Sequence, residues 1–221
     1  MKERNGLTMN GGKFMDKKII ITIAREYGSG GREIGKKIAD QLKIPFYDKE
    51  LITIAAKESG FKPEIFEKND EQVDYSNNYL TAIGYVLGSP VAGLTDISMN
   101  DELHMIQTNV IRQLADKGSC VIVGRCANYV LRDDEAMVSV FITGDTEDKV
   151  LRVVNDYHAA SLEDAEKLME KTDKRRGNYY NYYTNQDWKD AQHYDLCVNS
   201  SVLGIDKTVD LICEFAKLKI Q

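Results

Sequence analysis

The chain has 221 residues, of which 43% are hydrophobic and 29% are charged, and its formal net charge is −6 at pH 7. This composition is typical of a folded globular protein and excludes an extended disordered chain. The acidic balance argues against a dedicated nucleic-acid binder, because such proteins carry a basic excess. The longest uncharged stretch, residues 75–95, is interrupted by Asn, Ser, Gly and Pro, which argues against a membrane span. We therefore expect a cytoplasmic protein that binds neither nucleic acid nor a membrane.

The cysteines and histidines show no disulfide or metal-site pattern. The four cysteines form no Cys-x-x-Cys pair, and three of them lie in or beside apolar runs, so we expect reduced, buried thiols. The three histidines stand in unrelated contexts, and we expect no metal site built from protein ligands. The first residues are polar and lack the apolar core of a signal peptide, so we expect residues 1–17 to form a disordered extension.

The first predicted elements are a strand, a glycine-rich turn and a helix. Residues 18–24 are rich in isoleucine without polar alternation, which predicts a central parallel strand buried on both faces. A turn of small residues follows at positions 28–31, and an amphipathic helix is predicted over residues 31–42. This order is the pattern of a phosphate-binding loop, in which backbone N–H groups and the positive end of a helix dipole meet an anion. Such a turn can also be a connection without a ligand.

Apolar runs in the middle of the chain predict two further strands, each with a polar residue at its end. Residues 45–47 form a short apolar run that ends in Asp48, at the strand end where open α/β sheets place ligands. A helical pattern follows at residues 49–58, whereas residues 61–100 show no regular pattern and are treated as an insertion. After a helix predicted over residues 103–114, another buried strand is predicted to end on Arg125.

The last third of the chain continues the alternation of strands and helices. A strand is predicted at residues 138–143, followed by a helix that Asp145 or Thr146 caps. Ser161 opens a capping box at the start of a long polar helix. A strand at residues 194–199 precedes a closing helix from about residue 205. Five strands that alternate with helices predict an α/β fold with a parallel five-stranded sheet and helices on both faces.

The glycine-rich turn departs from the standard phosphate-loop pattern, Gly-x-x-x-x-Gly-Lys-Ser/Thr. When Arg32 is placed on the lysine, Glu26 replaces the first glycine and Glu33 replaces the hydroxyl residue that holds Mg²⁺. Arginine can replace the lysine charge, although it binds phosphate as a planar fork. The predicted cofactor-binding residues are the small residues of the turn and the two residues after them: Gly28, Ser29, Gly30, Gly31, Arg32 and Glu33.

Several segments resemble the cytidylate kinase-like family of P-loop proteins. The most specific are residues 21–35, ITIAREYGSGGREIG, and residues 44–52, IPFYDKELI. Residues 121–131, VIVGRCANYVL, agree with the family, as do Trp188 and the strand at residues 194–196. The resemblance spans residues 18–217, and it is more distant to the bacterial cytidylate kinases proper.

The resemblance implies a P-loop NTPase three-layer sandwich with a helical monophosphate-binding insertion and a lid. On this basis we expect one domain over residues 18–221, with the insertion at residues 61–104 and the lid region at residues 157–190. Carried over by position, Asp48 lies near the monophosphate site, and Arg125 contacts the phosphate of the monophosphate. Arg152 lies where related kinases place arginines around the phosphates, so it joins these two residues as a predicted substrate-binding residue.

The resemblance also identifies a lid segment. Asp173 and Arg176 match the Asp-x-x-Arg pattern of the kinase lid, and Arg175 is adjacent. Arginines of a closed lid stabilise the negative charge that spreads over a phosphoryl group in transfer. The alternative is a solvated helix face, on which basic residues pair with acidic residues one turn away. The aromatic stretch at residues 179–188 is interpreted as packing of the lid on the core, with base stacking as an alternative.

The activity that the resemblance implies is transfer of the γ-phosphoryl group of ATP to a nucleoside monophosphate, with CMP or dCMP suggested by the family name. ATP and Mg²⁺ are the implied cofactors, with Mg²⁺ held mainly through the phosphates. The implied catalytic residues are Arg32, Arg175 and Arg176. No residue has the pattern of a nucleophile or general base, which fits a reaction in which the substrate phosphate itself attacks.

Two other functions remain open from the sequence. Lys49 and Glu50 replace a Thr-Gly pair of cytidylate kinases, and Cys126 replaces an aspartate, which favours a kinase for another small phosphoacceptor. The lack of a hydroxyl at Glu33 favours a non-catalytic nucleotide-binding or regulatory module. The expected partners are small-molecule nucleotides, and the oligomeric state is open.

Overall fold

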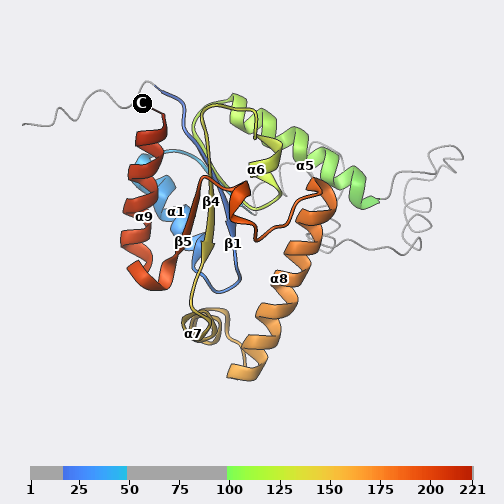
Figure 1. Ribbon diagram of the computed structural model, residues 1–221, viewed down its shortest axis with the longest axis vertical. Coiled ribbons are helices and arrows are strands. Elements are labelled where there is room, and N and C mark those ends of the chain that lie inside the picture. Colours follow the sequence, from blue (N-terminus) through green and yellow to red (C-terminus); the bar gives the residue numbers. More distant parts are fainter. Residues whose placement is uncertain (1–16, 49–98, 221) are drawn as a thin grey trace, which may run out of the picture.

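The computed structural model describes residues 17–48 and 99–220 (Figure 1). Five parallel strands form one sheet in the order β2-β3-β1-β4-β5. The strands are β1 (Ile20–Arg25), β2 (Phe46–Tyr47), β3 (Cys120–Val123), β4 (Met137–Thr143) and β5 (Leu196–Asn199). The helices are α1 (Gly31–Leu42), α5 (Met99–Asp116), α6 (Ala127–Val130), α7 (Thr146–Tyr157), α8 (Leu162–Thr184) and α9 (Ser200–Lys219), and a 3-10 turn, η1 (Ala191–His193), precedes β5. The predicted parallel α/β sheet is confirmed.

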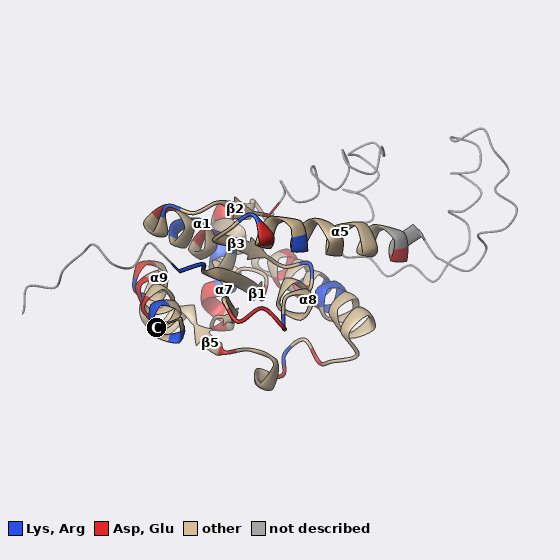
Figure 2. Ribbon diagram, turned by 90° about the horizontal axis from the view of Figure 1, so that it is seen from above, with Lys and Arg blue, Asp and Glu red and all other residues tan. Residues whose placement is uncertain are grey.

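Helices cover both faces of this sheet, as the view from above shows (Figure 2). On one face, Ile21 and Ile23 of β1 pack with the apolar sides of α1 and α9. On the other face, Ile20 packs with α5 and α6. Side chains of β1 are thus buried on both sides, which is the physical reason for its isoleucine-rich sequence. Within residues 17–48 and 99–220, no helix is both long enough and apolar enough to cross a membrane.

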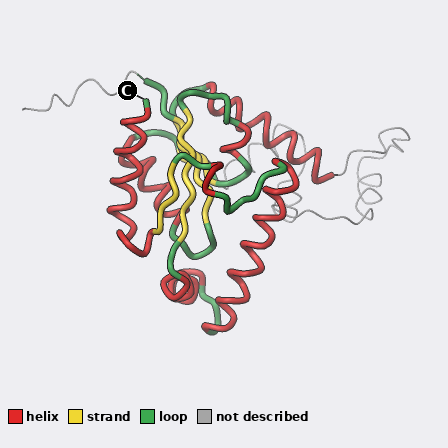
Figure 3. The backbone as a smooth tube through the Cα atoms, viewed as in Figure 1, coloured by secondary structure: helices red, strands yellow, loops and turns green. Residues whose placement is uncertain are grey.

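The carboxyl ends of the three central strands meet at one edge of the sheet. β1 pairs with β3 on one side and with β4 on the other, so that Ile23 lies level with Val123 and Val140. The loops that follow β1 and β4 lie at this edge, next to α7 (Figure 3). α8 packs near the same edge. Its residues Tyr179 and Tyr180 are buried there in an aromatic cluster with Trp188, Phe141 and Tyr194. This packing agrees with the structural interpretation of the aromatic stretch.

Some local features differ from expectation. The four-residue helix α6 was not predicted, because an element so short leaves no periodic pattern. α9 includes residues 200–204, although Gly204 breaks the helical backbone with φ 73° and ψ 170°. Cys197 is exposed on the edge strand β5, whereas the other three cysteines are buried and all four are free thiols. The helical pattern at residues 49–58 and the irregular stretch at 61–98 lie outside the described residues.

Candidate functional site

The loop between β1 and α1 contains two glycines that the backbone requires. Gly28 and Gly30 have φ angles of 78° and 76°, in the left-handed region that other residues rarely adopt. Space is also limiting, since a Cβ atom on Gly28 would lie 2.7 Å from the carbonyl oxygen of Lys149. A Cβ atom on Gly30 would lie 2.5 Å from Cδ1 of Ile205. The loop is therefore packed tightly against α7 and α9.

The backbone N–H groups in the first turn of α1 donate no capping hydrogen bond to a side chain of the described residues. Gly30 is the N-cap residue, and no side chain of the described residues caps this helix. By contrast, Ser161 caps α8 by accepting a hydrogen bond from the Asp164 N–H. From α7, Nη1 of Arg152 donates to the carbonyl oxygen of Gly28 at 2.7 Å, so this predicted site residue lies against the loop. Helix N–H groups beside a guanidinium favour binding of an anion.

Ser29 stabilises the loop from within. Its side chain is buried, and its hydroxyl donates to the carbonyl oxygen of Glu26 at 2.8 Å. The hydroxyl of Ser200, at the start of α9, donates to the Ser29 carbonyl oxygen at 2.7 Å. Ser29 thereby links the phosphate-loop candidate to the end of β5.

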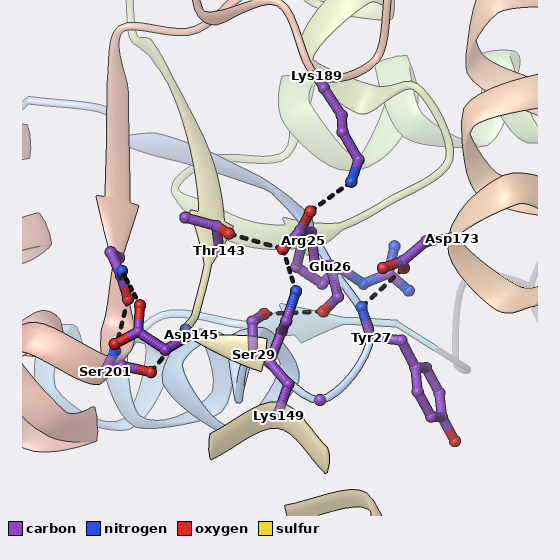
Figure 4. A network of polar contacts seen from close by, with 12 residues as sticks. Arg25, Glu26, Tyr27, Ser29, Thr143, Asp145, Lys149, Asp173, Lys189 and Ser201 are labelled. Atoms are coloured by element: carbon purple, nitrogen blue, oxygen red, sulfur yellow. Dashed lines mark hydrogen bonds and ion pairs between the residues drawn. The ribbon is translucent and has the colours of Figure 1, made fainter. Parts of the chain in front are cut away.

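Glu26 is the centre of a buried ionic network at the start of the loop (Figure 4). One carboxylate oxygen accepts hydrogen bonds from Lys149 of α7 and Thr143 of β4, both at 2.6 Å. The other accepts a hydrogen bond from Lys189 at 2.5 Å. Burial alone would raise the pKa of the Glu26 carboxyl, but the hydrogen bonds from Lys149, Lys189 and Thr143 outweigh it and lower the pKa to about 2. Glu26 therefore remains ionised and ties the loop to α7 and to the segment after α8.

Two predicted lid residues hold the loop from α8. Oδ1 of Asp173 accepts a hydrogen bond from the Tyr27 N–H at 2.7 Å. Nη1 of Arg176 donates to the carbonyl oxygen of Arg25 at 3.2 Å, and the guanidinium lies 5.4 Å from the centre of the Tyr27 ring. Arg175, the residue before Arg176 in α8, has an exposed side chain. The Asp-x-x-Arg segment is thus in direct contact with the loop, whereas Arg175 faces solvent.

Arg32 and Asp48, both predicted site residues, are brought together. Nε of Arg32 donates to Oδ2 of Asp48 at 2.6 Å, which joins the first turn of α1 to the end of β2. The Arg32 side chain remains 53% exposed, whereas Asp48 is 13% exposed. Glu33 turns outward and lies 3.3 Å from Lys37, one turn further along α1. Arg32 therefore lies on the β2 side of the loop, toward the acceptor side that the resemblance implies.

Arg125 is buried at the carboxyl end of β3 in an unusual backbone. Gly124, Arg125 and Cys126 have consecutive positive φ angles of 80°, 61° and 54°. Arg125 lines a small cavity together with Arg25 and Arg176. The cavity has a volume of about 20 Å³, and the described residues around it include no carboxylate. Burial and the charge of Arg25 lower the pKa of the Arg125 guanidinium to about 10. Three arginines therefore lie close together at this edge of the sheet, and Arg176 also pairs with Asp173 at 3.5 Å.

A larger cleft opens on the other side of the Glu26 network. It has a volume of about 650 Å³ and lies between α7, α8 and the segment 187–189. Lys149, Asp173 and Lys189 are among its lining residues, so the loop is accessible from this side. In the described parts of the chain, no three His, Cys, Asp or Glu side chains form a metal site.

The structure brings several of the predicted site residues close together. The loop glycines, Arg152, Arg125 and Arg176 gather at one edge of the sheet, as expected. Arg25 and the partners of Glu26 were missed. The available signal was the pair Arg25-Glu26 directly at the end of a buried strand, where parallel sheets place functional side chains.

Comparisons with known proteins agree with the fold. A model of the cytidylate kinase-like family matches residues 20–202. The crystal structure of an uncharacterized protein from Eubacterium ventriosum is 31% identical, with a TM-score of 0.67, over 90% of this chain and 98% of that chain. Shikimate kinase from Bacteroides thetaiotaomicron is 13% identical, with a TM-score of 0.53, over 90% of this chain and 98% of that chain. Shikimate kinase from Acinetobacter baumannii, in complex with shikimate, is 16% identical, with a TM-score of 0.50, over 91% and 94%.

The two shikimate kinases are too distant in sequence to show more than the fold, and that fold is the expected P-loop three-layer sandwich. No curated protein matches the chain significantly.

Proposed function

The chain belongs to the cytidylate kinase-like family, and from that premise we propose that it is an ATP- and Mg²⁺-dependent kinase for a nucleoside monophosphate. CMP or dCMP is the acceptor that the family name suggests. The observation that carries the proposal is that Arg25, Arg125 and Arg176 line one cavity, and that Arg25 also lies against Gly31 in the first turn of α1. Such an arrangement suits the negative charge of two substrates whose phosphates must meet.

The loop and α7 form the proposed donor side. The backbone around Gly28, Ser29, Gly30 and Gly31 would receive the phosphates of ATP at the positive end of α1, with Arg152 beside it. Mg²⁺, when bound with ATP, would supply positive charge that offsets the charge of the donor phosphates. Because Glu33 offers no hydroxyl and turns toward Lys37, the ion would be held mainly through those phosphates.

The proposed acceptor side lies between β2 and β3. Arg125 would bind the phosphate of the monophosphate, and Arg32 and Asp48 would border it. Arg176 and Arg175 of α8 belong to the proposed lid region, residues 157–190, within a single domain over residues 18–221. The residues of this side bind and orient the acceptor, and an oxygen of its own phosphate attacks. No general base is needed, because positioning and charge neutralisation account for most of the catalysis of phosphoryl transfer.

A kinase for another small phosphoacceptor is the second candidate. Its motivation is that Lys49, Glu50 and Cys126 replace the Thr-Gly pair and the aspartate of cytidylate kinases. A third candidate is a non-catalytic nucleotide-binding module, which the outward position of Glu33 favours.

The activity is tested by incubating the protein with MgATP and each common nucleoside monophosphate, and by measuring ADP release in a coupled assay. We expect ADP release above the ATP-only rate with at least one pyrimidine monophosphate. We also expect that acceptor, with a non-hydrolysable ATP analogue, to raise the melting temperature, because ligands that bind the native state stabilise it. Turnover only with a non-nucleotide acceptor would support the second candidate, and ATP binding without any transfer would support the third.

A further inference from the structure

Arg25, the last residue of β1, lies across two glycines at the carboxyl edge of the sheet. A Cβ atom placed on Gly31 would lie 2.5 Å from Cβ of Arg25 and 2.9 Å from its Cγ. A Cβ atom placed on Gly124 would lie 2.5 Å from Nη1 of Arg25 and 3.3 Å from its Cζ. The side chain therefore starts beside the first turn of α1 and extends to the end of β3.

Gly31 has no backbone reason to be glycine. It is the first residue of α1 and is not among the glycines with a positive φ angle. Glycine is the poorest helix former after proline, so its use in a first helical turn requires another cause. The atoms closest to its absent side chain are those of the Arg25 stem. Gly31 therefore leaves the space that the side chain of Arg25 occupies.

The guanidinium of Arg25 lies between the two proposed substrate sides. Its stem adjoins α1, where the donor phosphates are proposed, and its Nη1 adjoins Gly124, one residue before Arg125. It also shares the lining of the 20 Å³ cavity with Arg125 and Arg176. The backbone of Arg25 is fixed from the lid side, because Arg176 donates to its carbonyl oxygen.

Arg32 is the residue that the sequence places at the lysine of the standard phosphate loop, but its side chain points towards β2. Its Nε pairs with Asp48 at 2.6 Å, and over half of its side chain is exposed. Its guanidinium carbon lies 6.0 Å from the centre of the Phe46 ring, on the β2 side. Of the two arginines, Arg25 is the one that lies beside both α1 and β3.

We propose that Arg25 is the catalytic cation of this loop, and that its guanidinium contacts the β- and γ-phosphates of the nucleotide as lysine does in a standard phosphate loop. This assignment rests on the proposed nucleotide-dependent function. Arg32 then acts on the acceptor side through Asp48. The planar fork of Arg25 would bind phosphate oxygens through N–H groups of fixed geometry, whereas a lysine binds them as a point charge.

The test is calorimetric titration of the full chain with a non-hydrolysable ATP analogue and with ADP, both with Mg²⁺. Arg25→Met keeps the unbranched stem over Gly31 and removes the charge. We expect it to weaken the ATP analogue roughly 10- to 100-fold, as for loss of a charge-assisted hydrogen bond, and ADP by less. Arg25→Lys should recover part of the affinity. The melting temperature reports folding, and Arg112→Met on the exposed face of α5 is the matched control.

An equal loss for ATP analogue and ADP, or no loss, would overturn the assignment, since a structural role does not distinguish the γ-phosphate. If Arg32→Met, and not Arg25→Met, weakens the ATP analogue more than ADP, Arg32 would be the residue that replaces the lysine of a standard phosphate loop. If Arg25→Met does not fold, Arg25→Gln takes its place. Its loss of affinity for the ATP analogue is then compared with its loss of affinity for ADP. If the wild-type protein binds the analogue but transfers no phosphoryl group, the kinase proposal is wrong. The role of Arg25 is then decided by the affinities of the variants for the ATP analogue and ADP. A wild-type protein that binds neither nucleotide overturns both.

Discussion

Replacement of Arg125 with methionine is expected to lower kcat/KM for the phosphoacceptor by about 100- to 1,000-fold, comparable to the removal of one oxyanion donor. The melting temperature should stay unchanged or rise slightly. The guanidinium is buried beside those of Arg25 and Arg176, so its charge carries a desolvation cost that an anionic substrate would offset. Function and stability should therefore respond in opposite directions, as is common for functional residues.

The measurements are steady-state kinetics with the acceptor that the activity screen identifies, and thermal unfolding. Arg125→Lys, which keeps the charge but loses the planar fork, should retain an intermediate activity. Arg112→Met, an exposed arginine of α5, controls for loss of a positive charge. A fall of more than about 5 °C in the melting temperature of Arg125→Met, equivalent to roughly 1–2 kcal/mol in a protein of this size, would instead indicate a structural arginine.

Replacement of Glu26 with glutamine is expected to lower the free energy of unfolding by about 3 kcal/mol, because it leaves a buried lysine without its counter-ion. The Glu26 and Lys149 side chains are only 9% and 10% exposed. The substitution is nearly isosteric, so the loss reflects charge rather than packing. Unfolding in urea at pH 7 gives the free energy. Lys189→Met should cost less than about 1 kcal/mol, because the Lys189 side chain is 56% exposed and screened by solvent.

A double variant separates the ion pair from the packing. Glu26→Gln combined with Lys149→Met removes both charges, and we expect most of the lost stability to return, since a buried pair can often be replaced by apolar groups at little cost. An additive loss from the two single variants would instead show that Lys149 contributes to stability independently of Glu26.

The same network has a signature at acidic pH. The Glu26 carboxyl has a pKa of about 2 in the folded protein, against an ordinary value of 4.5. A carboxyl with a lowered pKa stabilises the fold above the unfolded value, and this contribution is lost as the pH falls from about 4.5 to about 2. In that window the wild type should lose stability more steeply than Glu26→Gln. Parallel pH profiles of the two proteins would contradict the assignment of Glu26 as the centre of the network.

The strands and most helices follow from local pattern. Parallel strands that are covered on both faces need continuous β-branched residues, so the run at residues 18–24 was recognisable and corresponds to β1. Ser161 was recognisable as the cap of α8, because the capping hydrogen bond joins residues three positions apart. Glycines 28 and 30 could likewise be assigned to a turn before α1. These features depend on neighbours within a few residues.

The chemistry of the loop depended instead on contacts that the chain makes over long distances. Glu26 meets Lys149 and Lys189, which lie 123 and 163 residues further along. Nothing near Glu26 in the sequence indicates these partners, so it was interpreted only as a departure from a motif. The Arg25 side chain extends past Gly31 towards β3 because Gly31 leaves space for it, whereas the Arg32 side chain is drawn to Asp48 at the end of β2. Secondary structure is set by local periodicity, whereas the direction of a charged side chain is set by the partners that only folding brings to it.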